Sequence, residues 1–166
     1  MNLVPNVKND SFEPRAKFIF NKNGDLNISI DSIFELIRDI KDPEHDFTLE
    51  QLNVVKKEYI SIFEFTKDDE CLNVGLPVKC LMVRFVPTIP HCSMAAIIGL
   101  SLIYILKNYI KDHIIKIEIV LGTHVNDKLI NKQLNDKDRV QAAFENEALN
   151  DVINDCTANI FSKYNF

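Results

Sequence analysis

The sequence predicts an α+β fold in which a small mixed sheet of about three strands packs against helices, in the order α-β-β-α-β-α-α. Two patterns lead to this prediction. Apolar side chains recur with the helical spacing i, i+3, i+4, i+7 near both ends of the chain, whereas residues 115–121 place an apolar side chain at every second position. The chain has 166 residues, 46% of them hydrophobic, which is enough for one ordinary domain with its own core.

The first 29 residues are predicted to form a flexible arm, and residues 30–166 to form the domain. The arm contains scattered Pro, Gly and Asn and shows no sustained period. The first helix is expected to begin near Asp31, which can cap it, and to end before Pro43. Its buried face would be formed by Ile30, Ile33, Phe34, Ile37 and Ile40.

Two strands are predicted next. The pattern Thr-Leu-Glu-Gln at residues 48–51 is typical of a capping box and indicates one short helical turn. Residues 54–65 are rich in β-branched and aromatic side chains, as strands are. Residues 66–77 are predicted to be a polar connector, and residues 78–86 a second, central strand. We therefore expect an antiparallel hairpin with a long loop.

A helix over residues 92–109 follows the second strand. Ala95 and Gly99 lie four residues apart on it and form a small-residue stripe that another backbone can approach closely. Ile103, Tyr104 and Ile105 point in too many directions to face one core. At least one of them is therefore expected to meet another element or another chain.

The third strand and the helical C-terminal part complete the predicted fold. The strand covers residues 115–121, with Lys116 and Glu118 facing solvent and Gly122 at its end. A short helix covers residues 128–134, and Asp136 or Asp138 caps the next one. The last helix would bury Leu149, Val152, Ile153, Cys156 and Ile160.

Composition excludes several classes of protein. The net charge of −5 and pI of about 5.4 give no electrostatic attraction to nucleic acid or to acidic membranes. Residues 1–10 lack the apolar core of a secretory signal, so we expect a reducing intracellular compartment in which the cysteines are thiols. The uncharged segment between Arg84 and Lys107 is interrupted by Pro87 and Pro90, and its apolar part is too short to span a bilayer.

The four cysteines, Cys71, Cys80, Cys92 and Cys156, form no C-x-x-C pair, which excludes a zinc ribbon or a thioredoxin-type site. Cys92 stands at a predicted helix start, where unpaired N–H groups favour a thiolate. The alternative is a small buried side chain, which is the role expected of Cys80 and Cys156. A catalytic thiol would need a base. His91 is adjacent, but neighbouring side chains at a helix start usually diverge. His124, after the Gly122 turn, could approach it in space, whereas His45 and His113 are expected at the surface.

The turn Asp42-Pro43-Glu44-His45 gathers two carboxylates and an imidazole. It can be a plain helix stop. A metal site would require Cys92 to gather ligands from this turn, which sequence spacing does not test.

Together these segments resemble the MIP18 family, also called DUF59. The resemblance lies in IRDIKDPEH and TLEQLNVV at residues 37–45 and 48–55, and in PTIPHCSM at residues 87–94, followed by IGLS at residues 98–101. It continues in Gly122-Thr123-His124 and in residues 131–134 and 139–146. Separated motifs in one order, from about residue 30 to 160, make the resemblance specific, and it favours the MIP18 branch of the family over its paralogue.

The resemblance implies an adaptor, not an enzyme, that helps to deliver iron–sulfur clusters to cytosolic and nuclear apo-proteins. It implies a WD40 propeller protein and a HEAT-repeat adaptor as partners, a location in cytoplasm and nucleus, and no direct contact with nucleic acid or membrane. The motif residues carried over are the reactive thiol Cys92, the acidic turn of Asp42 and Glu44, and Thr88, Pro90, His91, Ser93 and His124.

No tightly bound cofactor is expected, and Cys92 is the single candidate ligand for a transient iron–sulfur cluster. One cysteine cannot complete the usual shell of four thiolates, so a cluster would need a partner's ligands or a homodimer. Exchange of an element about the long hairpin loop would produce such a homodimer. A transient cluster or metal carrier and a thiol enzyme remain the alternative functions.

Overall fold

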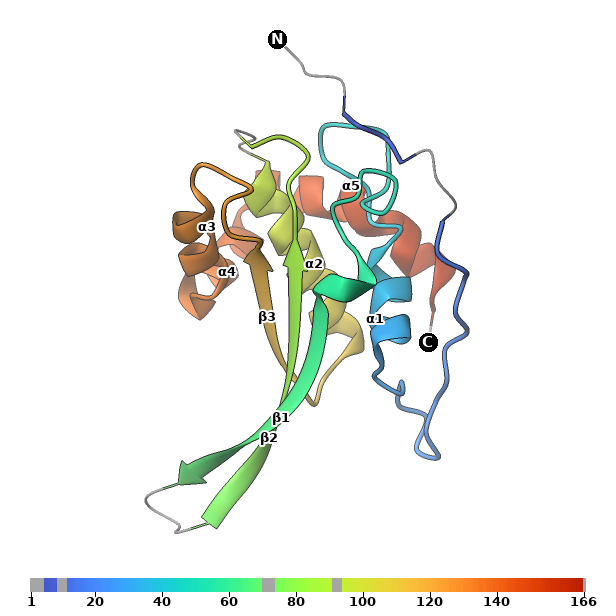
Figure 1. Ribbon diagram of the computed structural model, residues 1–166, viewed down its shortest axis with the longest axis vertical. Helices are drawn as coiled ribbons and strands as arrows, with labels where there is room; N and C mark the ends of the chain where they lie inside the picture. Colours follow the sequence, from blue (N-terminus) through green and yellow to red (C-terminus); the bar gives the residue numbers. More distant parts are fainter. Residues whose placement is uncertain (1–4, 9–11, 70–73, 91–93, 166) are drawn as a thin grey trace.

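A computed structural model describes residues 5–8, 12–69, 74–90 and 94–165. The chain forms one three-stranded sheet, and Figure 1 shows helices behind it and beside it. The elements in chain order are α1 (Ile30–Ile37), η1 (Lys57–Tyr59), β1 (Ile60–Asp69), β2 (Val74–Phe85), α2 (Ala95–Tyr109), β3 (Ile114–Ile119), α3 (Asp127–Leu134), α4 (Lys137–Glu145) and α5 (Glu147–Lys163). The predicted α+β class and its element order are confirmed.

The sheet is mixed, with strand order β1-β2-β3. β1 pairs antiparallel with β2, and β2 pairs parallel with β3. Ile60 lies opposite Val83, which in turn lies beside Ile117, so the three form an apolar row across the sheet. All three are buried. β2 is the central strand, as predicted, and α2 provides the long crossover that a parallel pair requires.

α2 is covered on several sides within the chain. Ile103 and Ile105 are buried, and the Tyr104 ring contacts Phe144 of α4 and Phe161 of α5. The expectation that at least one of the three residues meets another element is therefore confirmed. Tyr104 stays half-buried, so burial of all three, which would exclude this helix as a partner contact, is not observed.

The hairpin departs from the prediction. β1 does not cover residues 54–65: η1 precedes it, it begins at Ile60, and it continues to Asp69. Residues 66–69 and 74–77, which were expected to belong to a polar connector, are paired strand, from Thr66 opposite Pro77 to Asp69 opposite Val74. Cross-strand pairing outweighs polarity here, since the outer part of the hairpin lies away from the core and both its faces can be polar. The described part of the expected hinge loop is thus paired strand.

Smaller corrections concern element ends. The N-cap of α1 is Ser29 and not Asp31, because the Ser29 and Ser32 side chains form a reciprocal capping box. α1 ends at Ile37, well before Pro43. β3 ends at Ile119, so Leu121 is exposed and lies outside the strand. Lys116 faces solvent as predicted, and Glu118 is half-buried. The predicted start of α2 at residue 92 lies outside the described residues.

A buried ionic cluster fixes α1 to the rest of the chain. The Arg38 side chain is 1% exposed, and its guanidinium donates to Glu50 at 2.7 and 2.9 Å and to Glu35 at 3.1 Å. It also donates to the carbonyls of Glu13 and Pro14. All the polar atoms of the guanidinium are therefore satisfied, which is the condition for burying a charge.

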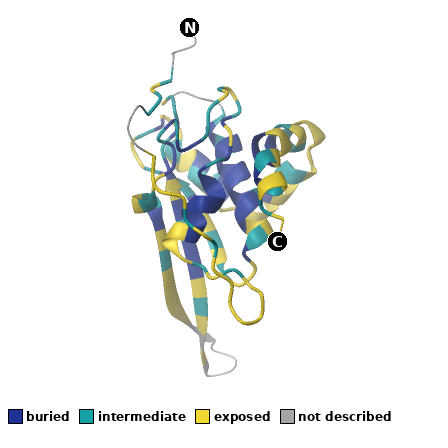
Figure 2. Ribbon diagram, turned by 90° about the vertical axis from the view of Figure 1, so that its right-hand side faces the viewer, coloured by how far each residue is buried: buried dark blue, intermediate teal, exposed yellow. Residues whose placement is uncertain are grey.

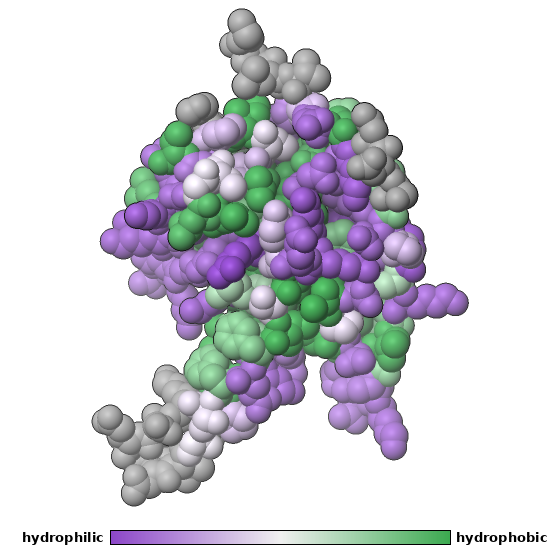
Figure 3. Space-filling model, viewed as in Figure 1, coloured by the Kyte–Doolittle hydropathy of each residue, from purple (hydrophilic) through white to green (hydrophobic). Residues whose placement is uncertain are grey.

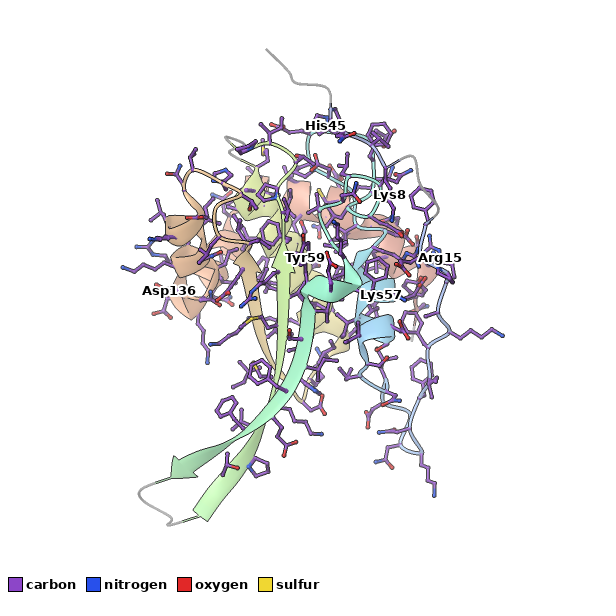
Figure 4. All side chains as sticks on the ribbon, in the orientation of Figure 1. Lys8, Arg15, His45, Lys57, Tyr59 and Asp136 are labelled. Atoms are coloured by element: carbon purple, nitrogen blue, oxygen red, sulfur yellow. The ribbon has the colours of Figure 1, made fainter. Side chains whose placement is uncertain are left out.

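The same cluster holds part of the N-terminal segment. Arg15 donates to Glu35 and to both carboxylate oxygens of Asp39 (Figure 4). Burial by itself would raise the pKa of Glu35, but hydrogen bonds from Arg15, the Ala16 N–H and Arg38 hold it below its ordinary value. The division into an arm of residues 1–29 and a domain of residues 30–166 stays a prediction. Within it, residues 13–16 contact α1.

One face of the sheet is not covered by helices. Phe63 and Phe65 of β1 and Ile114 of β3 lie on it and are between 41% and 48% exposed. Figure 2 shows the β1–β2 hairpin extending away from the body of the molecule, and Figure 3 shows apolar side chains gathered over the sheet. Within the described residues, no helix combines the length and the apolarity needed to span a bilayer.

Candidate functional site at the carboxyl end of the sheet

Two loops that carry predicted site residues leave the sheet at the same edge. β2 and β3 are parallel, so the segments that follow them emerge side by side. The Val120 N–H donates to the Phe85 carbonyl at 3.0 Å, and the Val125 N–H donates to the Pro90 carbonyl at 3.0 Å. These bonds bring Pro90 and His124 into neighbouring loops, at the upper end of the molecule in Figure 1.

The structure describes some of the predicted site residues and not others. His91, Cys92 and Ser93 lie outside the described residues, so their assignments stay predictions. Thr88 is half-buried, and its hydroxyl oxygen is buried without a hydrogen-bond partner in the described part of the chain. An unpaired buried hydroxyl costs stability, so the lack of a partner among the described residues marks Thr88 as a position that a further group could stabilise.

His124 is buried, with 7% of its surface exposed, and its ring is fixed by its own loop. Its Nδ1 accepts a hydrogen bond from the Asn126 N–H at 3.0 Å. An Nδ1 that accepts leaves the proton of the neutral ring on Nε2, which is then a donor. A general base needs a free lone pair directed at the thiol. The neutral His124 ring could therefore offer a lone pair on Nε2 only if its proton moved to Nδ1, which would break the hydrogen bond from the Asn126 N–H.

Gly122 shapes this loop. Its φ is +85°, a conformation that favours glycine, and its N–H donates to the Asp127 carboxylate at 2.7 Å. That hydrogen bond lowers the pKa of Asp127. Asp127 thus closes the turn that presents His124, a role that the sequence analysis did not assign. The only sign of this role in the sequence is that Asp127 lies five residues after Gly122, the glycine that follows the predicted strand.

Asn131 is a second residue without an assigned role in the sequence analysis. Its amide accepts from the Ile119 N–H at 2.7 Å and donates to the Ile119 carbonyl at 3.1 Å. It thus pairs with β3 as a neighbouring strand would, and it attaches α3 to the edge of the sheet. Asn131 belongs to the 131–134 motif of the resemblance, which had suggested no function for it.

The acidic turn is a structured loop packed on α5. Asp42 is buried, and one of its carboxylate oxygens accepts from the N–H groups of Glu44 and His45 at 2.9 and 3.0 Å. The Lys41 N–H donates to the Cys156 carbonyl of α5 at 3.0 Å. Asp42 is thus committed to its own turn, whereas Glu44 is exposed. Figure 4 shows His45 at the same end of the molecule as the other loops.

A pocket of about 260 Å³ separates this turn from α5, and Asp42, His45, Asp155 and Cys156 contribute to its lining. The Nε2 atom of His45 is buried without a partner among the described residues. Burial, followed by the charges of Asp42 and Asp155, raises the pKa of Cys156 to about 11. Cys156 is thus a protonated thiol at neutral pH, and its predicted place in the core is confirmed.

Two other predicted roles can be compared with the structure. Cys80 is buried as expected, and burial raises its pKa. His113 was expected at the surface, but its side chain is only 6% exposed and its ring bonds to Asp112 at 2.8 Å. Among the described residues, no three His, Cys, Asp or Glu side chains converge to hold a metal ion. A metal site that includes Cys92 stays untested.

Known proteins are similar to this chain over most of its length. The chain is 42% identical to a MIP18 family protein of Caenorhabditis elegans over 149 residues, which cover 87% of each protein. It is 45% identical to MIP18 family protein galla-2 of Drosophila melanogaster, over 76% of this chain and 74% of the relative. This chain belongs to the MIP18 family. No family model matches it.

A further MIP18 relative carries a functional name. Over 77% of this chain and 73% of the relative, the chain is 44% identical to cytosolic iron-sulfur assembly component 2B of Mus musculus. The resemblance to the MIP18 family inferred from the motifs is thereby confirmed. The roles of individual site residues are not tested by this similarity.

Proposed function

We propose that this chain is a component of cytosolic iron–sulfur protein assembly and acts as an adaptor without turnover of its own. The similarity to cytosolic iron-sulfur assembly component 2B is the observation that supports it most. The His124 ring supports the adaptor over a thiol enzyme, because its Nδ1 is occupied by the Asn126 N–H. In this proposal the cluster is cargo.

Cys92 is the thiol that the proposal assigns to cluster delivery. It lies two residues after Pro90, whose carbonyl is held by the Val125 N–H. Its loop therefore follows an anchored position beside His124. A single thiolate leaves most of a cluster's ligand positions to other molecules, so Cys92 would act in a complex and not by itself.

The adaptor proposal requires partners, and the ones expected are a WD40 propeller protein, a HEAT-repeat adaptor and apo-proteins that receive clusters. Affinity purification of the tagged chain from its own cell tests this directly. We expect a propeller and a HEAT-repeat protein in stoichiometric amounts, with cluster-requiring enzymes in smaller amounts. Recovery of neither scaffold protein would contradict the proposal.

The alternative function is a transient carrier of iron–sulfur clusters, and the purified chain can be used to test it. The purified chain would be reconstituted anaerobically with iron and sulfide, and its visible spectrum recorded before and after gel filtration. An adaptor should lose all cluster absorbance on gel filtration. Retained absorbance that disappears in Cys92→Ala would instead assign the chain as a carrier.

A further inference from the structure

A basic groove lies beside the free edge of β3. It has a volume of about 710 Å³ and runs between the end of α2, β3, and the junction of α3 with α4. Figure 4 labels Asp136 at that junction. Its apolar floor is formed by Ile103, Ile110, Ile115, Leu134 and Val140.

Lysines surround this floor. Lys107, Lys111, Lys116 and Lys137 all line the groove, and no carboxylate does. Among the described residues, none of the four has an acidic side chain within ion-pairing distance. The Lys111 ammonium donates only to the Lys107 carbonyl at the end of α2. This local excess of positive charge stands in a chain whose net charge is −5, so it does not follow from the overall composition.

The wall of the groove is an unpaired strand edge. β3 is the last strand of the sheet. The Asn131 side chain bonds both the N–H and the carbonyl of Ile119, so the main chain of Ile119 points away from β2 toward the free edge. Residues two apart on a strand face the same side, so the main chain of Ile115 also points outward. Ile117 lies between them on that edge and is fully buried, whereas Ile115 is partly exposed in the groove.

We infer that this groove binds an extended segment of a partner protein that is rich in Asp or Glu and carries apolar side chains at alternate positions. The segment would add to the sheet at Ile115, place its apolar side chains on the floor, and direct its carboxylates to Lys107 and Lys137. Peptides that add to a sheet edge gain main-chain hydrogen bonds there, and complementary charge sets which peptide is accepted. A phosphate backbone would leave the apolar floor unused.

The test uses the full chain and a fluorescein-labelled peptide of alternating Asp and Val, followed by fluorescence anisotropy. Lys107→Glu with Lys137→Glu should weaken binding at least about tenfold, since two attractive charges become repulsive. The matched control, Lys17→Glu with Lys22→Glu, changes the net charge equally at exposed positions outside the groove and should leave binding unchanged. Amide exchange at Ile115 should slow in the presence of the peptide.

Other results would overturn the inference. If both double variants weakened peptide binding equally, net charge and not the groove would explain the binding. Equal binding of a Lys-Val peptide would remove the role of the lysines. Competition by single-stranded DNA that is lost in the groove variant would assign the site to nucleic acid. A dimer of the free chain that dissociates in the groove variant would assign it to a second copy. None of these measurements depends on iron–sulfur assembly.

Discussion

The cations at the two edges of this molecule are used in opposite ways. At α1, Arg38 is buried, and every donor of its guanidinium meets a carboxylate or a carbonyl. At the β3 edge, Lys107 and Lys137 are exposed beside buried apolar side chains and have no acidic partner among the described residues. A paired buried charge belongs to the fold, whereas unpaired charges around an apolar floor are available to another molecule. Mutations at the two edges should therefore have different consequences.

The largest expected difference is in the free energy of unfolding. Arg38→Ala would leave Glu35 and Glu50 buried without their main partner, which should cost about 3–5 kcal/mol. Lys137→Ala, at the other edge, should change stability by less than about 0.5 kcal/mol. Urea denaturation of both variants measures the contrast. A cost for Arg38→Ala as small as that of Lys137→Ala would show that the ionic cluster does not hold α1.

Acid should weaken the α1 edge before the β3 edge. The pKa of Glu35 is held below its ordinary value of 4.5, so its ionised form stabilises the folded state above that pH. This contribution is lost as the pH falls through the lowered pKa. The difference in melting temperature between the wild type and Glu35→Gln should thus be constant from neutral pH down to about 4.5. It should shrink as the pH falls further. A difference that grows on acidification would contradict the assignment.

Gly99 gives a smaller effect that joins the core to the groove. A Cβ at this position would lie 2.5 Å from a terminal carbon of Leu134, which lines the groove. The small-residue stripe on α2 thus receives a side chain of α3. Gly99→Ala should cost about 1–3 kcal/mol, because Leu134 must shift. Adding Leu134→Val should recover part of that cost, and a purely additive double variant would exclude the contact.

Local patterns predicted the fold where one face of an element is buried. The alternation of Ile115, Ile117 and Ile119 identified β3, and the helical period identified α1 and α5. The limits of β1 could not be predicted in the same way. Residues 66–69 are paired because β2 lies beside them, and their own composition does not indicate a strand.

The candidate site shows the same division. The motifs located the loops that contain Pro90 and His124, and the parallel order of β2 and β3 explains why they meet. The bonds of Asn131 could not be predicted, because they depend on the Ile119 backbone that the fold brings close. The bond from the Asn126 N–H to His124 is local, but it depends on a loop conformation that the sequence pattern does not indicate. The ionic cluster around Arg38 likewise joins residues that are far apart in sequence. Each of these charged residues, considered by itself, would be predicted to lie at the surface.

The central claim is that Cys92 serves delivery of iron–sulfur clusters and not the stability of the fold. Cys92→Ala and Cys92→Ser would replace the wild type in its own cell, with Cys80→Ala as a matched control in the core. The iron content of purified client enzymes would then be measured, together with the melting temperature of the chain and its recovery with the propeller protein. We expect both Cys92 variants to lower client iron sharply at a stability cost of about 1 kcal/mol or less. The propeller complex should remain intact in both variants, and client iron should be normal in Cys80→Ala. Normal client iron in both Cys92 variants would contradict the claim.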